Sequence, residues 1–185
     1  MNIIEEVRKF VEEECKKDSS KYGYEIFKNH FVSAANYARI LSNKINSDKE
    51  VIEIAIWLHD IGSIIYGREN HNITGAKIAE NKLKELEYPA EKLELVKKCI
   101  LNHRGSVKSK TESNEEKIIV DADALSAFDH IEGQFKAALV YENKSLDDAR
   151  ISVRTKLINS LNKLVFEESK KLIEPKYRAA MELLS

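Results

Sequence analysis

The chain has 185 residues, a formal net charge of −1, and 43% hydrophobic residues. This length suits one domain, residues 1–185, with a single sizeable core, and the small net charge excludes a global field that would attract a nucleic-acid polymer or an anionic membrane. With 6 Gly and 2 Pro, the composition also excludes a turn-rich all-β fold.

The expected location is the cytoplasm. The sequence holds no apolar run long enough to span a membrane, and the acidic residues directly after Ile3 and Ile4 argue against a signal peptide. Cys15 and Cys99 fit no zinc-binding pattern, so we expect them to be reduced thiols. No membrane partner is expected.

Apolar residues recur at helical spacing along most of the chain, which predicts an all-α bundle of about eight helices. The central helix, ending at His59-Asp60, is apolar almost all round and should be buried, and Gly62 is a plausible stop after it. The expected helices cover residues 2–17, 25–45, 48–60, 71–86, 90–103, a segment from the Ser113–Glu116 capping box to Phe128, 146–166, and a last segment bent or broken at Pro175.

Two segments lack helical spacing and are expected to be loops. Residues 63–70 would lie at the mouth of any site, and residues 104–114 form a polar, basic loop or lid. The cationic residues that would flank this mouth are Arg68, Lys77, Arg104, Lys108 and Lys110.

Several histidines and aspartates lie inside apolar helices or at their ends. Nitrogen and oxygen donors from several helices, without cysteine, suit a divalent ion such as Mn²⁺, Fe²⁺, Co²⁺, Ni²⁺ or Mg²⁺. Two imidazoles and two carboxylates would neutralise one dication and leave positions for water and a substrate oxygen. The residues concerned are His30, His59, His71, His103, Asp60, Asp121 and Asp123.

Five segments of the sequence carry a resemblance to a known family. In order they read HFVSAANYARIL, AIWLHDIGS, HNITGAKIAENKL, CILNHRGS and EEKIIVDADALSAF. Their succession of a histidine, a His-Asp pair and a final aspartate resembles the HD-domain superfamily of metal-dependent phosphohydrolases, in its small single-domain form. The resemblance covers roughly residues 25–135, and helices within 136–185 are expected to pack on that core.

The resemblance implies that His30, His59, Asp60 and Asp123 hold one metal ion. Asp123 fits the final aspartate of the family better than Asp121, because a small residue precedes it. Asp121 is the second candidate for that ligand. It could also be a base beside the metal, or merely a hydrogen-bond partner of a backbone group or of a ligand histidine.

His71 and His103 match histidines that hold a second metal in binuclear relatives and contact substrate phosphate in mononuclear ones. A further histidine that some binuclear relatives carry close to His71 is missing here, so the sequence favours one ion over two. Each of the two could also be structural, with His103 opposing the negative end of its helix.

The implied activity is hydrolysis of a phosphoester or phosphoanhydride bond in a small molecule, with a nucleotide as the favoured substrate. Asp60 or Asp121 would take the proton of the attacking water, and Lys77 or Arg104 would neutralise the phosphoryl group. The alternatives are a di-iron HD-type oxygenase and a regulatory module that binds a nucleotide without turnover. A homodimer is left open.

Overall fold

The computed structural model describes residues 2–104 and 111–185. Every regular element in these two ranges is helical, which confirms the all-α fold. Two of their ten α-helices, α4 and α8, have six residues each, so the remaining longer helices match the expected number. The elements are α1 (Ile3–Lys16), η1 (Phe27–Phe31), α2 (Val32–Ser42), α3 (Lys49–Leu58), α4 (Ile61–Tyr66), α5 (His71–Glu85), α6 (Ala90–Asn102), α7 (Asn114–Ser126), α8 (Ile131–Lys136), η2 (Ala137–Tyr141), α9 (Leu146–Lys163) and α10 (Glu167–Leu183), where η marks a π-helix.

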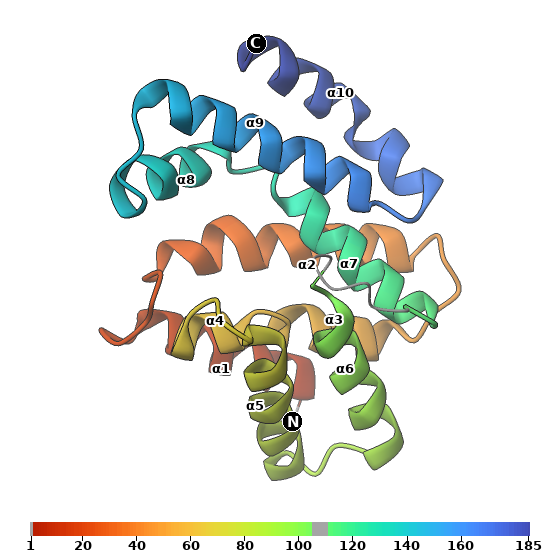
Figure 1. The fold of residues 1–185 in the computed structure, drawn as a ribbon. Coiled ribbons are helices and arrows are strands. Elements are labelled where there is room, and N and C mark those ends of the chain that lie inside the picture. The colour runs from red at the N-terminus through yellow and green to blue at the C-terminus, as the bar shows by residue number, and fades with distance from the viewer. Residues whose placement is uncertain (1, 105–110) are drawn as a thin grey trace.

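The helices form three levels in Figure 1, with α8, α9 and α10 at one end, α2 and α7 across the middle, and the other α-helices at the opposite end. Helix α3 packs against α1, α2, α5, α6 and α7. Its residues from Val51 to Leu58 are therefore nearly all buried, which explains why this helix is apolar around its whole circumference.

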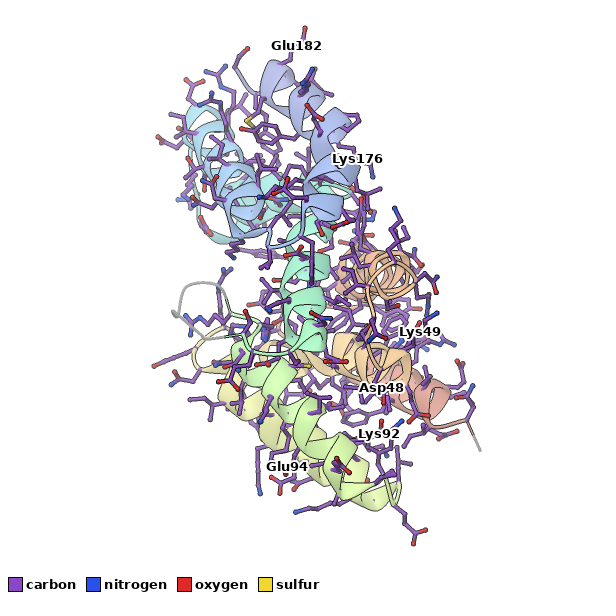
Figure 2. All side chains as sticks on the ribbon, turned by 90° about the vertical axis from the view of Figure 1, so that its right-hand side faces the viewer. Asp48, Lys49, Lys92, Glu94, Lys176 and Glu182 are labelled. Carbon is purple, nitrogen blue, oxygen red and sulfur yellow. The ribbon has the colours of Figure 1, made fainter. Side chains whose placement is uncertain are left out.

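The predicted helix starts are confirmed where a side chain caps the backbone. Asp48 accepts hydrogen bonds from the N–H groups of Glu50 and Val51, and the Ser113–Glu116 capping box opens α7. Asp48 also pairs with Lys92 at 3.0 Å, which ties the start of α3 to α6, as Figure 2 shows.

The expectation of a loop over residues 63–70 is wrong for its first half. Residues Ile61–Tyr66 form α4, and Gly62 lies inside that helix rather than ending α3. A methyl group at Gly62 would meet the carbonyl oxygen of His71 at 2.2 Å, so glycine is needed there for the close approach of α5. A segment of six residues is also too short to show a helical period.

Pro175 does not break the last helix, because α10 continues from Glu167 to Leu183 with the proline inside it. The carbonyl that loses its partner belongs to the exposed Lys171, which water can reach. Helix α8 and segment η2 lie where the sequence predicted no element.

Cys15 and Cys99 are both buried as free thiols. Across the described ranges, the structure contains no helix that is both long and apolar enough to cross a membrane. Residues 105–110 of the expected loop, with Lys108 and Lys110, lie outside the described part of the chain.

Candidate metal centre

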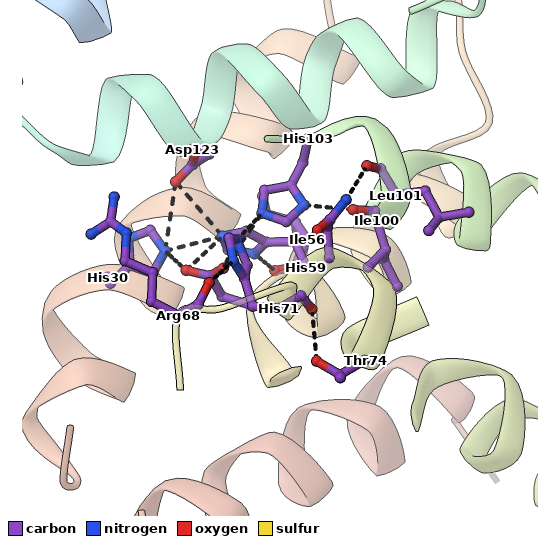
Figure 3. A network of polar contacts seen from close by, with 12 residues as sticks. His30, Ile56, His59, Arg68, His71, Thr74, Ile100, Leu101, His103 and Asp123 are labelled. Carbon is purple, nitrogen blue, oxygen red and sulfur yellow. Dashed lines mark hydrogen bonds and ion pairs between the residues drawn. The ribbon is translucent and has the colours of Figure 1, made fainter. Parts of the chain in front are cut away.

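Four histidine side chains from different elements converge in the interior (Figure 3). His30 comes from η1, His59 ends α3, His71 begins α5, and His103 ends α6. Their Nε2 atoms meet in two pairs: His30 lies 3.0 Å from His59, and His71 lies 3.2 Å from His103. The structure thus brings together all four histidines that the sequence singled out.

Asp60 lies between the two histidine pairs. Its Oδ2 atom is 3.4 Å from Nε2 of His30 and 3.9 Å from Nε2 of His59. Its Oδ1 atom is 3.3 Å from Nε2 of His71 and 3.4 Å from Nε2 of His103. One carboxylate therefore belongs to two donor groups, which we call the first group (His30, His59, Asp60) and the second group (Asp60, His71, His103).

Asp123 joins the first group from α7. Its Oδ1 atom lies 3.7 Å from Nε2 of both His30 and His59. In Figure 3 the Asp123 side chain points down from α7 toward these imidazoles. The four ligands that the sequence assigned to one ion, His30, His59, Asp60 and Asp123, are thus neighbours in space.

The other ring nitrogen of each histidine is engaged, which fixes the ring. Nδ1 of His59, His71 and His103 contacts the backbone carbonyl three residues earlier, of Ile56, Arg68 and Ile100, at 2.7, 2.8 and 2.6 Å. Because a carbonyl only accepts, each of these Nδ1 atoms carries the proton. In the neutral imidazole, the lone pair is then on Nε2, the atom that points into the cluster.

His30 is held through a side chain instead. Its Nδ1 lies 3.0 Å from Oγ of Ser126, whose hydroxyl donates to the backbone carbonyl of Asp123 at 2.7 Å. The hydroxyl proton is thus committed, so Oγ is left to accept a proton from Nδ1 of His30. Ser126 is a supporting residue that the sequence analysis missed.

The donor set fits divalent cations. Neutral imidazoles would present two lone pairs to each other at 3.0 and 3.2 Å, which is unfavourable unless a proton or a cation lies between them. Two nitrogen ligands about 2.1 Å from one ion, at angles of roughly 90–110°, lie about 3.0–3.4 Å apart. The two observed separations match this spacing, so each group could hold one ion.

Both carboxylates of the cluster are ionised. Burial would raise the pKa of Asp60, but the imidazoles of His59, His103 and His30 outweigh it and hold that pKa well below its usual value. Burial and Asp60 oppose ionisation of Asp123, yet His59 and His30 lower its pKa too. The centre therefore offers anionic oxygen ligands, and its imidazoles become nitrogen ligands once Nε2 loses its proton to an incoming cation, a combination that suits Mn²⁺, Fe²⁺, Co²⁺ or Ni²⁺.

Local backbone geometry explains how the ligands reach one point. His30 lies in a π-helical turn, in which Val32 N–H donates to the carbonyl of Phe27, and such turns are often found at functional sites. Asp60 occupies the N-cap position of α4 and directs its carboxylate to the histidines. Asn70 adopts the left-handed conformation, with φ +49°, immediately before His71.

The expected role of Asp121 as a base is wrong. Asp121 is fully buried, and its carboxylate accepts from the backbone N–H groups of Val165 at 2.7 Å and Phe166 at 3.0 Å. It therefore holds the backbone of the two residues that directly precede α10, on the other side of α7 from Asp123. The alternative stated above, a hydrogen-bond partner of backbone groups, is what the structure shows.

The two cationic candidates differ in position. Lys77 is exposed on α5 and pairs with Glu80 at 3.4 Å, in a cluster that includes Lys84 and Lys97, so it belongs to the helix surface. Arg104 directly follows His103. Burial, and then the charges of His103 and Arg104, lower the pKa of His71 although Asp60 opposes them.

Lys156 of α9 is a charged residue that the sequence analysis did not single out. Its pKa is lowered by burial and by repulsion from Arg68, against the attraction of Asp123 and Asp60. The sequence carried no signal for it, because the largely apolar stripe of this helix runs through Ala149, Val153, Leu157 and Ser160 without a break.

Comparison with known sequences identifies a family. The family model described as HD domain matches residues 27–127. This range contains the five residues of the two groups and also Asp123, which makes six ligand candidates in all. An uncharacterized protein of Clostridium beijerinckii is 31% identical over 101 residues, which make up 52% of this chain and 62% of that protein. The aligned region thus spans less than two thirds of that relative.

Comparison with solved structures identifies the same fold. An HD-superfamily hydrolase from Bacillus thuringiensis superposes with a TM-score of 0.76 at 21% identity, covering 98% of this chain and 93% of that one. YpgQ from Bacillus subtilis, solved in complex with ADP, superposes with a TM-score of 0.74 at 19% identity and the same coverage. At these identities the likeness concerns the fold.

Proposed function

The chain belongs to the HD domain family, and from this premise we propose that it is a metal-dependent phosphohydrolase acting on a small phosphate compound, with a nucleotide as the favoured substrate. The observation that carries the proposal is the sharing of Asp60 between two groups of inward-facing imidazoles. Such donor sets hold the divalent ions that hydrolytic sites use. The ADP bound to YpgQ, which has a similar fold, supports the choice of a nucleotide.

We favour two ions over the single ion that the sequence favoured. Asp60 turns one oxygen toward each group, and each group has its own pair of Nε2 atoms at ligand spacing. His71 and His103 would then be ligands rather than contacts to a substrate phosphate. Asp123 would complete the first group.

The ions, when bound, would acidify a water molecule and polarise a phosphoryl oxygen. The protein's own part is to hold the imidazoles as Nδ1–H tautomers, so that Nε2 is always available. Asp60, whose carboxylate lies between the two groups, is the residue to which we assign acceptance of the proton of the attacking water. Arg104 would neutralise charge on the phosphoryl group.

The test is an assay of purified protein with Mn²⁺, Co²⁺, Ni²⁺, Fe²⁺ or Mg²⁺ against a panel of nucleotides and bis-p-nitrophenyl phosphate. We expect turnover that requires a divalent ion and is lost in Asp60→Ala. If the wild type and Asp60→Ala release product equally slowly with every metal, the proposal is wrong.

The arrangement also suits a di-iron oxygenase, because that chemistry needs both donor groups. Two irons per chain, consumption of O₂ and the absence of phosphate release would favour that alternative. A regulatory module would instead show stabilisation by a nucleotide without product formation. Cationic residues suit a phosphate compound, which favours the hydrolase over the oxygenase, whereas only product formation distinguishes the hydrolase from the regulatory module.

A further inference from the structure

The capping box at the start of α7 contains a carboxylate that is almost completely buried. Glu116 is 3% exposed, and its Oε2 atom accepts from the backbone N–H groups of Ser113 at 2.9 Å and Glu112 at 3.1 Å. These contacts form one half of the capping box. A glutamate is seldom buried this deeply unless its oxygens are paired, so the other oxygen also needs a partner.

That partner is Asn102, the last residue of α6. Its Nδ2 atom donates to Oε1 of Glu116 at 2.5 Å. Burial opposes ionisation of Glu116, but the Ser113 N–H, the Asn102 amide and the Glu112 N–H lower its pKa below the usual value. Hydrogen bonds to an ionised acceptor are roughly twice as strong as neutral ones. The contact therefore ties the end of α6 firmly to the first turn of α7.

Asn102 directly precedes His103, a ligand candidate of the second group. The last carbonyls of a helix have no partner within the helix, and two of those in α6 are used nearby. Ile100 accepts the Nδ1 proton of His103 at 2.6 Å, and Leu101 accepts from the Asn72 amide at 2.9 Å. Figure 3 shows Ile100 and Leu101 beside His103. The direction in which His103 points thus depends on where this last turn of α6 is held.

The last turn of α6 is held from two sides, since α6 packs against both α5 and α7. Asn72, which follows His71 at the start of α5, holds it from one side. Glu116 holds it from the other through Asn102. The contact with Glu116 is charged and buried, so we expect it to be the stronger of the two.

Helix α7 therefore serves both donor groups. Asp123 follows Glu116 by seven residues, close to two helical turns, so both lie on nearly the same face of α7. Asp123 approaches the imidazoles of the first group directly, at 3.7 Å. Glu116 reaches the second group only through Asn102 and the backbone of α6.

We propose that Glu116 is a positioning residue, which fixes the end of α6 through Asn102 and thereby places His103 in the second group. This inference rests on the proposed function, in which His103 is a ligand of the second ion. The capping box then has two roles, because it begins α7 and also holds the segment that carries a ligand.

Binding of Mn²⁺ to the full-length, metal-free protein tests the inference without turnover. Calorimetry resolves the two ions, and Asp123→Ala, which lacks a ligand of the first group, assigns each binding step. In Asn102→Ala we expect the ion of the second group to bind about tenfold more weakly, and that of the first group to change less than about twofold, because contacts that support ligand histidines commonly affect metal affinity by about 10–100-fold.

The matched control is Ser113→Ala. It removes the hydroxyl that accepts from the Glu116 N–H at 3.2 Å, but it leaves the Glu116 carboxylate and Asn102 in place. This variant should lose stability and still bind both ions like the wild type. If Ser113→Ala lost the second ion as Asn102→Ala does, the contact would be merely structural and the inference would be wrong.

A double variant tests rescue. In Asn102→Asp with Glu116→Gln, the glutamine amide can donate to the aspartate while its oxygen accepts from the backbone N–H groups, and the total charge is unchanged. It should bind the second ion within about threefold of the wild type, because the hydrogen bond is reversed rather than lost.

The ring nitrogens of His103 give a readout that needs no metal. At about pH 8, where imidazoles are neutral, their ¹⁵N shifts report the tautomer. The wild type and Ser113→Ala should show the Nδ1–H tautomer, and Asn102→Ala a mixture. Wild-type shifts and wild-type Mn²⁺ binding in Asn102→Ala would overturn the inference. Altered shifts in Asn102→Ala, with a wild type that binds no second ion or releases no phosphate, would support the inference and contradict the proposed function.

Discussion

Three of the four histidines in the centre are oriented by one local rule. His59, His71 and His103 each donate from Nδ1 to the carbonyl three residues earlier, a group that helix ends and turns leave available. His30 lies in a π-helical turn and needs Ser126 of α7 for the same purpose. The contacts of the first three histidines can be predicted from the local sequence, whereas the contact of His30 with Ser126 depends on how two distant segments pack.

Two aspartates of α7, two residues apart, should have separable roles. Asp121→Ala removes the acceptor of two backbone N–H groups at the start of α10, so we expect the free energy of unfolding to fall by roughly 2–3 kcal/mol. Asp123→Ala removes a carboxylate from the first group, so we expect loss of bound metal with little loss of stability in the metal-free protein. Urea unfolding and metal analysis of both variants measure these effects.

Each variant is the control for the other. Both remove a buried or half-buried carboxylate from the same helix, so a general effect of losing charge would appear in both. If Asp121→Ala lost metal as completely as Asp123→Ala while remaining folded, the separation of roles would be wrong.

At the scale of elements, the contact between α4 and α5 positions His71 beside Asp60. A methyl group at Gly62 would meet the His71 carbonyl oxygen at 2.2 Å, Thr74 Oγ1 at 2.5 Å and Gly75 N at 2.6 Å. Because these include backbone atoms, α5 must move. We expect Gly62→Ala to cost about 1–3 kcal/mol of stability and to weaken metal binding to the second group, measured by urea unfolding and metal titration.

Gly133→Ala is the matched control for that substitution. Gly133 lies in α8, and an added methyl group would meet nothing within 4 Å in the described structure. Alanine within a helix is more favourable than glycine by about 0.5–1 kcal/mol. This variant should therefore be as stable as the wild type or more stable. Unchanged metal affinity in Gly62→Ala would contradict the assigned role of this contact.

A partly buried ionic cluster connects α10 to the rest of the bundle. Asp129 accepts from Ser33 at 2.5 Å and from Tyr37 at 2.9 Å, and it pairs with Lys176 of α10. Burial opposes ionisation, but Lys176, Ser33 and Tyr37 lower the pKa of Asp129 below its usual value. The cluster should therefore contribute to stability only while Asp129 is ionised.

The sign of the pH dependence follows from that lowered pKa. The contribution of Asp129 is fully present above its unfolded pKa, about 3.9, and is lost as the pH falls through the lower folded value. We expect Asp129→Asn to be less stable than the wild type by about 1 kcal/mol at pH 6, with the difference shrinking toward pH 2. Urea unfolding at several pH values checks this, and a constant difference would contradict it.

The length of an element decided how well the sequence predicted it. Long helices such as α3 and α5 show their apolar period and their caps, so their positions could be predicted. Helix α4 has six residues and a glycine whose purpose lies in a different helix, so its sequence looked like a loop.

At the scale of the whole molecule, the metal centre joins segments that are far apart in the sequence. Its ligand candidates come from η1, α3, α5, α6 and α7 and the residue that opens α4, while α8, α9 and α10 hold no ligand candidate in the part described. Ligands that bind only the folded protein stabilise it, by about 2.7 kcal/mol at a concentration one hundred times the Kd. The fold and the metal content should therefore be thermodynamically linked.

Removal of metal tests this linkage. We expect dialysis against a chelator to lower the Tm by several degrees, and added Mn²⁺ to restore it in a concentration-dependent way, because the unfolded chain cannot bring these ligands together. Differential scanning calorimetry measures both steps. Asp123→Ala should fold but lacks one ligand. The chelator and Mn²⁺ should therefore each change its Tm less than they change that of the wild type. A Tm that is the same with and without Mn²⁺ would mean that the six ligand candidates do not bind this cation in the folded protein, and it would contradict the proposed function.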